Sequence, residues 1–191
     1  MRRWKRWVDR SSDALLQGDH DVRAAASRRL SEVRLRGPGS LRPRQVASLM
    51  MRFRDAVLRH PDADTRRDVA YVLAQWGDQR TVGVFLTVVA DPGAEPEIRG
   101  LAAEALGFDL QFAPEASALR SRAVATLRTC LTDAAPAVRF WSLYALGTLD
   151  ARDARGDVAK LVGDDAIFRE GFWSVGDEAR EVLALFDAPA N

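Results

Sequence analysis

A repeated arginine pattern restricts the possible folds of this 191-residue chain more than any other feature. In five segments a turn, in most cases acidic, is followed by an apolar residue, an arginine and then small or apolar residues at helical spacing. The arginines are separated by 43, 33, 40 and 41 residues, which is the period of a two-helix repeat. They are Arg23, Arg66, Arg99, Arg139 and Arg180.

Each arginine opens a segment with the apolar periodicity of a helix, and a second amphipathic segment follows before the next turn. We expect Gly77, Gly107 and Gly147 to end first helices, because glycine readily adopts the backbone conformation found there. Strand signals are nearly absent. The sequence therefore predicts an all-α, right-handed α-α superhelix (solenoid) of about five helix pairs. Its second helices are expected at approximately 43–59, 79–90, 115–132 and 153–163.

Two of these segments, residues 91–107 and 133–147, resemble HEAT repeats, and more narrowly the short bacterial type related to the phycobilin-lyase repeats. The resemblance extends over residues 19–187. It implies one HEAT-like domain over 1–191, with a capping helix at 1–18, repeats at 19–163, and an aromatic loop with a C-terminal capping helix at 164–187. HEAT repeats occur in scaffolds, chaperone-like factors, lyases and DNA-repair enzymes, so the resemblance indicates a fold rather than one function.

The five repeated arginines have two interpretations. They could line a concave anion-binding face, or each could pair with an acidic turn residue of its own or the adjacent repeat and so fix the stacking of repeats. We favour the structural ladder, because the position recurs with the fold. The candidate acidic partners are Asp21, Asp64, Glu97, Asp133 and Asp177.

The charge of the chain is unevenly distributed. Residues 1–60 hold 15 Lys+Arg against 6 Asp+Glu, whereas the remaining residues hold 13 against 21, which together give the net charge of +1. The start of this segment, residues 1–18, is interpreted first as a capping helix, and otherwise as a contact for nucleic acid, a membrane surface or another partner. The arginines that follow form a patch for an acidic ligand if they share a face, and are otherwise solvated charges. The candidate contact residues are Arg2, Arg3, Lys5, Arg6, Arg28, Arg29, Arg34 and Arg36.

An aromatic cluster precedes the last expected helix and consists of Phe168, Phe172 and Trp173. Aromatic residues in a loop can mark a partner site, since tryptophan is frequent among interface hot spots. We favour the alternative, in which they fold back over the terminal repeat and close its core.

Signatures of catalysis are weak. The sequence contains no phosphate-binding glycine loop, and neither His20 nor His60 begins a metal-binding pair. Cys130 lies in an apolar helical segment and is interpreted as a buried residue that forms no internal disulfide. We therefore assign no catalytic, cofactor-binding or metal-binding residue, expect no cofactor, and lean against an enzyme. The longest uncharged runs are too short to cross a membrane, which favours a cytoplasmic protein.

The leading hypothesis is a non-enzymatic protein-binding scaffold or adaptor in a bacterial cytoplasm, with its contact surface on the ridge of second helices. The alternative is a nucleic-acid-binding protein that uses the arginine-rich first 60 residues, including a DNA glycosylase of the HEAT type. A weaker alternative is a bilin lyase or chaperone-like factor. Another protein is the expected partner, and the sequence does not indicate the oligomeric state.

Overall fold

The computed structural model describes residues 2–33, 42–114, 117–169, 171 and 173–189, and only the backbone of residues 2–5. Contacts divide the chain into two compact units, 1–84 and 85–191, and each is described by itself. All regular structure in the described residues is helical. This confirms the all-α fold class, while the single domain over 1–191 stays a prediction.

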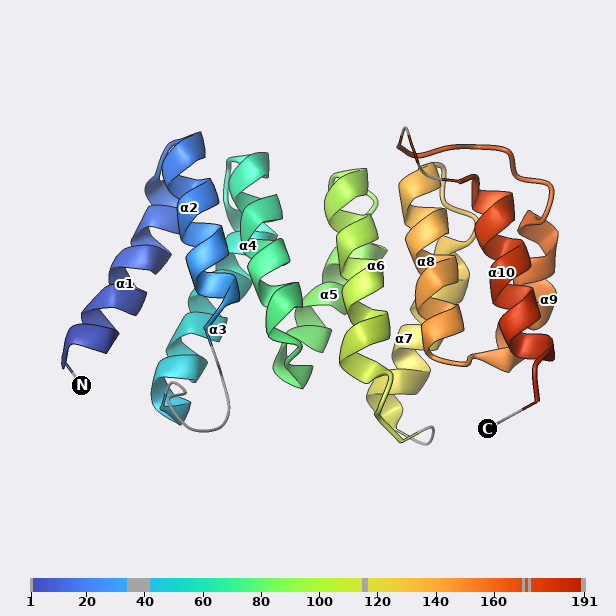
Figure 1. The fold of residues 1–191 in the computed structure, drawn as a ribbon, viewed down its shortest axis with the longest axis horizontal. Helices are drawn as coiled ribbons and strands as arrows, with labels where there is room; N and C mark the ends of the chain where they lie inside the picture. Colours follow the sequence, from blue (N-terminus) through green and yellow to red (C-terminus); the bar gives the residue numbers. More distant parts are fainter. Residues whose placement is uncertain (1, 34–41, 115–116, 170, 172, 190–191) are drawn as a thin grey trace. The chain divides into compact units, whose positions relative to one another are not determined.

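The first unit contains four helices and the start of a fifth (Figure 1). α2 packs on both α1 and α4, and α3 packs on α4. Their apolar faces meet around Leu15, Leu30, Phe53 and Leu73, all of which are fully buried. The helices are α1 (Arg2–Gln17), α2 (His20–Ser31), α3 (Pro43–Arg59) and α4 (Ala63–Trp76); the short helix η1 (Gln79–Thr81) and α5 (Val82–Ala90) follow, and α5 crosses the unit boundary.

In the second unit the helices that open each repeat, called first helices, lie side by side, with α8 between α6 and α10 (Figure 1). α7 packs on α8, and the short helices after α8 pack on α10. The core between them is formed by residues such as Leu106, Leu127, Leu143 and Val182. The helices are α6 (Pro96–Leu110), α7 (Ala118–Cys130), α8 (Pro136–Thr148), η2 (Arg152–Ala154), α9 (Arg155–Val158), η3 (Ala159–Leu161) and α10 (Val175–Asp187).

The helices begin where the sequence supplies a cap. Asp19 accepts a hydrogen bond from the Val22 amide at 3.0 Å at the start of α2. Ser174 and Asp177 form a reciprocal capping box at the start of α10. Proline occupies the first position of α3, α6 and α8, where its missing amide proton leaves no bond unmade.

The three glycines expected to end first helices behave differently. α4 ends at Gly77, which has a φ of 55°. Gly107 and Gly147, in contrast, lie inside α6 and α8, so the expectation was wrong for both. A Cβ on Gly107 would lie 3.0 Å from the Cα of Ala145, and one on Gly147 would lie 3.1 Å from Val182. These glycines are there because neighbouring first helices approach closely.

Candidate functional site

Two ladder arginines of the second unit, Arg99 and Arg139, have largely buried side chains and bond to acceptors in two repeats, whereas Arg180 is exposed. Arg99 in α6 donates to the carbonyl of Val89 at 3.1 Å and to the Asp133 carboxylate at 2.5 Å. Arg139 repeats this one helix pair later, with the carbonyl of Asp133 at 2.7 Å and the carboxylate of Asp164 at 2.8 Å. Arg99 therefore joins the end of α5 to the turn before α8, and Arg139 joins the turn before α8 to the segment before α10.

These contacts lower the pKa of the two carboxyl groups. Burial alone would raise the pKa of Asp133, but hydrogen bonds from the Ala135 amide and from Arg99 lower it overall. Burial likewise opposes the shift at Asp164, where the hydrogen bond from Arg139 lowers the pKa. Both groups are therefore held as carboxylates opposite a guanidinium.

The remaining ladder arginines show related contacts with different acceptors. Arg23 lies within 4 Å of the carboxylates that begin and line α4, those of Asp62, Asp64 and Asp68. Arg66 donates to the carbonyls of His60 and Pro61. Arg180 donates to Val162 at 2.6 Å and to Asp177 at 2.5 Å. These arginines thus bond to acceptors inside the protein.

The expected acidic partners need a partial correction. Asp64, Asp133 and Asp177 do contact ladder arginines. Asp21 instead lies 3.3 Å from the ring of His20, and Glu97 forms no ion pair with any residue that the structure describes. Arg23, Arg99 and Arg139 use carboxylates of the following repeat, whereas Arg180 uses Asp177 of its own helix. The position of an arginine within its repeat does not specify which of these carboxylates it contacts.

The basic N-terminal candidates are only partly described. Arg6 on α1 and Arg28 and Arg29 in the last turn of α2 have exposed side chains. Of Arg2, Arg3 and Lys5 only the backbone is described, within α1, and Arg34 and Arg36 lie outside the described residues. A contact surface built from all eight residues stays a prediction.

The aromatic loop contributes one packed residue and one half-exposed residue. The ring of Phe168 lies 4.8 Å from that of Phe140 and 5.9 Å from that of Trp141, both in α8. Trp173 is 50% exposed and donates its indole N–H to the carboxylate of Glu178 at 3.0 Å. Phe172 lies outside the described residues.

Phe168 belongs to a continuous row of ring contacts that sequence reasoning did not identify. The row continues from Trp141 to Tyr144 at 5.6 Å and from Tyr144 to Phe108 of α6 at 5.9 Å. Phe108 is 45% exposed, and Phe112, one turn later, is 92% exposed. Aromatic side chains therefore extend from the loop across α8 to the outer edge of α6.

Glu104 lies on the same helix as Phe108 and has no polar partner among the described residues. It is half-buried on α6, between Gly100 and Gly107, the two glycines at which α6 approaches α8. It makes no hydrogen bond or ion pair with any described residue, and burial raises the pKa of its carboxyl group. Glu104 stands one helical turn before Phe108 on α6, and an acidic group beside an aromatic side chain favours a cationic partner.

Together these side chains form one surface, which we call the first-helix face: Glu104, Phe108, Trp141, Tyr144 and Leu185. Leu185 of α10 is 57% exposed and lies against Gly147 of α8, so it extends the face beyond Tyr144. A signal for it is present in the sequence. Glu104, Tyr144 and Leu185 each stand five residues after a ladder arginine.

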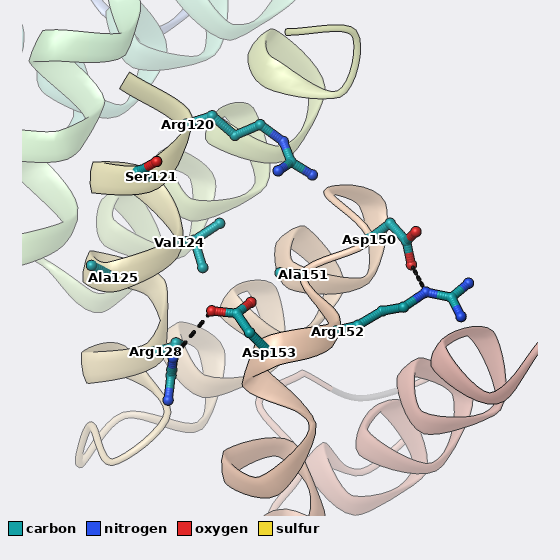
Figure 2. A pocket seen from close by; sticks show the side chains of 9 residues that line it. All are labelled: Arg120, Ser121, Val124, Ala125, Arg128, Asp150, Ala151, Arg152 and Asp153. Carbon is teal, nitrogen blue, oxygen red and sulfur yellow. Dashed lines mark hydrogen bonds and ion pairs between the residues drawn. The ribbon is translucent and has the colours of Figure 1, made fainter. Parts of the chain in front are cut away.

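A polar pocket of about 460 Å³ lies on another part of the second unit, between α7 and residues 150–153 (Figure 2). Arg128 on its α7 side lies 3.3 Å from Asp153 and 2.7 Å from Asp157. On the opposite wall Arg152 donates to Asp150 at 2.9 Å. Sequence reasoning did not identify this pocket, because its two walls are brought together only by the packing of α7 beside the end of α8.

No group of three or more histidine, cysteine or acidic residues in the described part of the chain is arranged to hold a metal ion. Among the same residues no helix is both long enough and apolar enough to span a bilayer.

The pairwise-packed helices, the caps and the arginine contacts define a helical-repeat protein. The fold matches a chain of the complex of CpcE and CpcF of phycocyanin lyase from Nostoc sp., with a TM-score of 0.54 and 18% identity, over 86% of this chain and 99% of that one. A second match covers 96% of both chains and is human deoxyhypusine hydroxylase in complex with glycerol, at 15% identity and a TM-score of 0.42. No model of a protein family and no curated protein matches the sequence. The first match confirms the HEAT-repeat resemblance at the level of the fold.

Proposed function

We propose that this protein is a non-enzymatic protein-binding scaffold whose partner docks on the first-helix face. The observation that carries the proposal is the gathering of large apolar side chains on exposed positions of α6, α8 and α10. Phe108 and Leu185 are about half exposed at its two edges, with Trp141 and Tyr144 half-buried between them. Aromatic residues in such a surface are the usual anchors of a protein interface.

This location differs from the ridge of second helices favoured by the sequence. Within helices, large exposed apolar side chains of the described residues fall mainly on first helices: Val22, Tyr71, Phe108 and Leu185, against Met51 and Leu119 on second helices. The exposed positions of α7 include Ser121, Arg122 and Thr129, which are polar. An apolar contact surface therefore fits the first helices better.

Glu104 indicates the chemistry of the partner. Its carboxylate is half-buried and forms no hydrogen bond or ion pair with a described residue. A lysine or arginine of the partner would therefore gain a charge-assisted bond to it and contact with the neighbouring aromatic side chains. We infer that the partner presents apolar side chains together with one basic side chain. The matched structure supports a protein ligand, because it is itself a complex of two proteins, CpcE and CpcF.

Site-specific photocrosslinking in the native host tests the proposal. We expect p-benzoylphenylalanine at Phe108 to form an adduct with one protein that survives nuclease treatment, and Glu104→Lys to reduce the yield at least about fivefold through charge repulsion. The matched control is the same photoreactive residue at Thr129, an exposed position on α7. Equal adducts from both positions, or none from position 108, would contradict the proposal.

The alternative function is nucleic-acid binding through the basic first 60 residues, with Arg28 and Arg29 exposed at the end of α2. Loss of all captured material after nuclease treatment would support that alternative. The lyase activity of the matched complex is not proposed for this chain, since a structure 18% identical indicates a shared fold alone.

A further inference from the structure

Arg120 differs from the other arginines of the pocket beside α7. It lies in the first turn of α7, is half-buried, and donates one N–H to the carbonyl of Leu149 at the end of α8. Its Nε is buried and has no hydrogen-bond acceptor among the residues that the structure describes. Figure 2 shows its guanidinium extending from α7 toward the segment that carries Asp150.

No carboxylate among the described residues balances the charge of Arg120. Arg128 is paired with Asp153 and Asp157, and Arg152 is paired with Asp150. Arg120, in contrast, forms no ion pair with any described residue. A half-buried cation with an unpaired N–H is unfavourable unless a polar ligand or water completes its bonds.

The pocket has room for such a ligand. Its volume of about 460 Å³ is many times the roughly 30 Å³ that one water molecule occupies in the liquid. Ser121 adds a hydroxyl group to the lining, and Val124 and Ala151 add apolar contact beside it. The lining thus combines one unbalanced cation, a hydroxyl and a small apolar wall.

The charge of the lining selects among anions. Three arginines and two aspartates give the lining residues a net charge of +1, and the pairing of Arg128 with Asp157 reduces its effect further. A dianionic phosphate would therefore meet two nearby carboxylates with little compensating charge. A planar, singly charged carboxylate matches one guanidinium and can accept two parallel N–H bonds.

We propose that this pocket binds a carboxylate group through Arg120. The inference is independent of the first-helix face, because none of the residues of that face lines the pocket.

Arginine side-chain NMR of the full chain tests the assignment. The Nε–H signal of Arg120, identified by its absence in Arg120→Gln, is followed during titration with acetate at constant ionic strength set by chloride. We expect a saturable shift, and a blocked peptide containing glutamate to produce the same shift while its glutamine counterpart does not. A shift with acetate but not with the glutamate peptide would assign the pocket to small organic acids. Shifts with both ligands would assign it to a carboxylate side chain of a protein.

Two variants separate binding from folding. Arg122→Gln removes an exposed arginine of the same helix and should leave the titration unchanged. Asp150→Asn should tighten acetate binding about three- to tenfold, since it removes a negative charge from the pocket wall. Asn is suited to this position because Asp150 has a φ of 46°, a left-handed conformation that asparagine tolerates.

Three results would overturn the proposal: a shift that follows ionic strength alone, phosphate binding as tightly as acetate, or unchanged affinity in Asp150→Asn. The crosslinking yield at Phe108 should be the same in Arg120→Gln as in the unaltered protein. This comparison shows separately whether the proposal for the carboxylate pocket fails and whether the proposal for the first-helix face fails.

Discussion

Arg99 is only 7% exposed inside the second unit, where burial of a charged side chain is unfavourable. The guanidinium is tolerated there because carbonyl and carboxylate oxygens accept its N–H groups on both sides. Such a pair adds little net stability compared with apolar residues of the same shape, but breaking it leaves an unpaired charge inside the protein. The contact therefore fixes which turn lies against which helix.

Replacing Arg99 with glutamine should lower the free energy of unfolding by about 2–4 kcal/mol, because Asp133 and the Val89 carbonyl lose their donors. Urea unfolding measures the change. Arg122→Gln, at an exposed position of α7, should alter stability by no more than about 0.5 kcal/mol. Similar losses in both variants would show that Arg99 has no special role.

Asp177 gives a pH-dependent prediction. Hydrogen bonds from the Ser174 hydroxyl and amide, and then from Arg180, lower its pKa from the ordinary 3.8 to about 2. Because the folded-state pKa is depressed, the stability from this group is complete above pH 3.8 and is lost as the pH falls toward about 2. Carboxyl NMR titration should find Asp177 near its depressed value, and Ser174→Ala should move the pKa upward. A pKa unchanged by Ser174→Ala would remove the assigned cause.

The arginine positions could be predicted from the sequence, but their acceptors could not. The repeat identified all five arginines, because each occupies the same place at the start of a first helix. Their carboxylates come from Asp62, Asp68 and Asp164 as well as from the expected residues. Those partners depend on the length of the connection between repeats, which varies along the chain.

First helices α6, α8 and α10 pack closely because small residues lie between them. Gly100 and Gly107 bring α6 against α8, and Gly147 brings α8 against α10. Helices that approach this closely also place their outer side chains in reach of one another, as the ring contact of Phe108 with Tyr144 shows. The first-helix face therefore depends on glycines that lie beneath it.

Gly107→Ala should destabilise the protein by about 1–3 kcal/mol, since the new Cβ would lie 3.0 Å from the Cα of Ala145. The control is Gly156→Ala in α9, where a Cβ meets nothing within 4 Å. We expect that change to be neutral or to stabilise by up to about 1 kcal/mol. Thermal unfolding of both variants measures the contrast, and a neutral Gly107→Ala would contradict the close packing.

Helix positions were largely predictable, and the exceptions have local causes. The segment expected at 43–59 is α3, with its proline at the first position. The segment expected at 153–163 is instead divided among η2, α9 and η3. Periodicity indicated Gly107 as a helix end, whereas packing against Ala145 makes a glycine necessary inside α6. These differences arise from contacts between helices of different repeats, which the sequence of a single repeat does not show.

The two compact units have opposite charge. Residues 1–84 hold 18 Lys+Arg and 10 Asp+Glu, and residues 85–191 hold 10 and 17, so balances of +8 and −7 give the net +1. In the first unit part of this positive charge is internally engaged, since Arg23 contacts three carboxylates of α4 and Arg52 contacts Asp13. These pairs reduce the number of arginines available to a ligand but do not reduce the balance of +8, because the carboxylates they engage are already counted in it.

A fluorescent duplex oligonucleotide should bind the protein weakly, and its fluorescence anisotropy should return to the unbound value at about 150 mM salt. The Arg28→Ala, Arg29→Ala double variant should behave like the unaltered protein above that salt concentration. Binding that persists there and weakens in the double variant would instead favour the nucleic-acid function.

The arginine contacts define where this chain can be divided. Arg99 belongs to one helix pair and its carboxylate, Asp133, to the next, and the same is true of Arg139 and Asp164. A cut between two helix pairs would leave the cation on one side and the anion on the other. Removing the chain that follows α8 would therefore leave Arg139 without the carboxylate of Asp164.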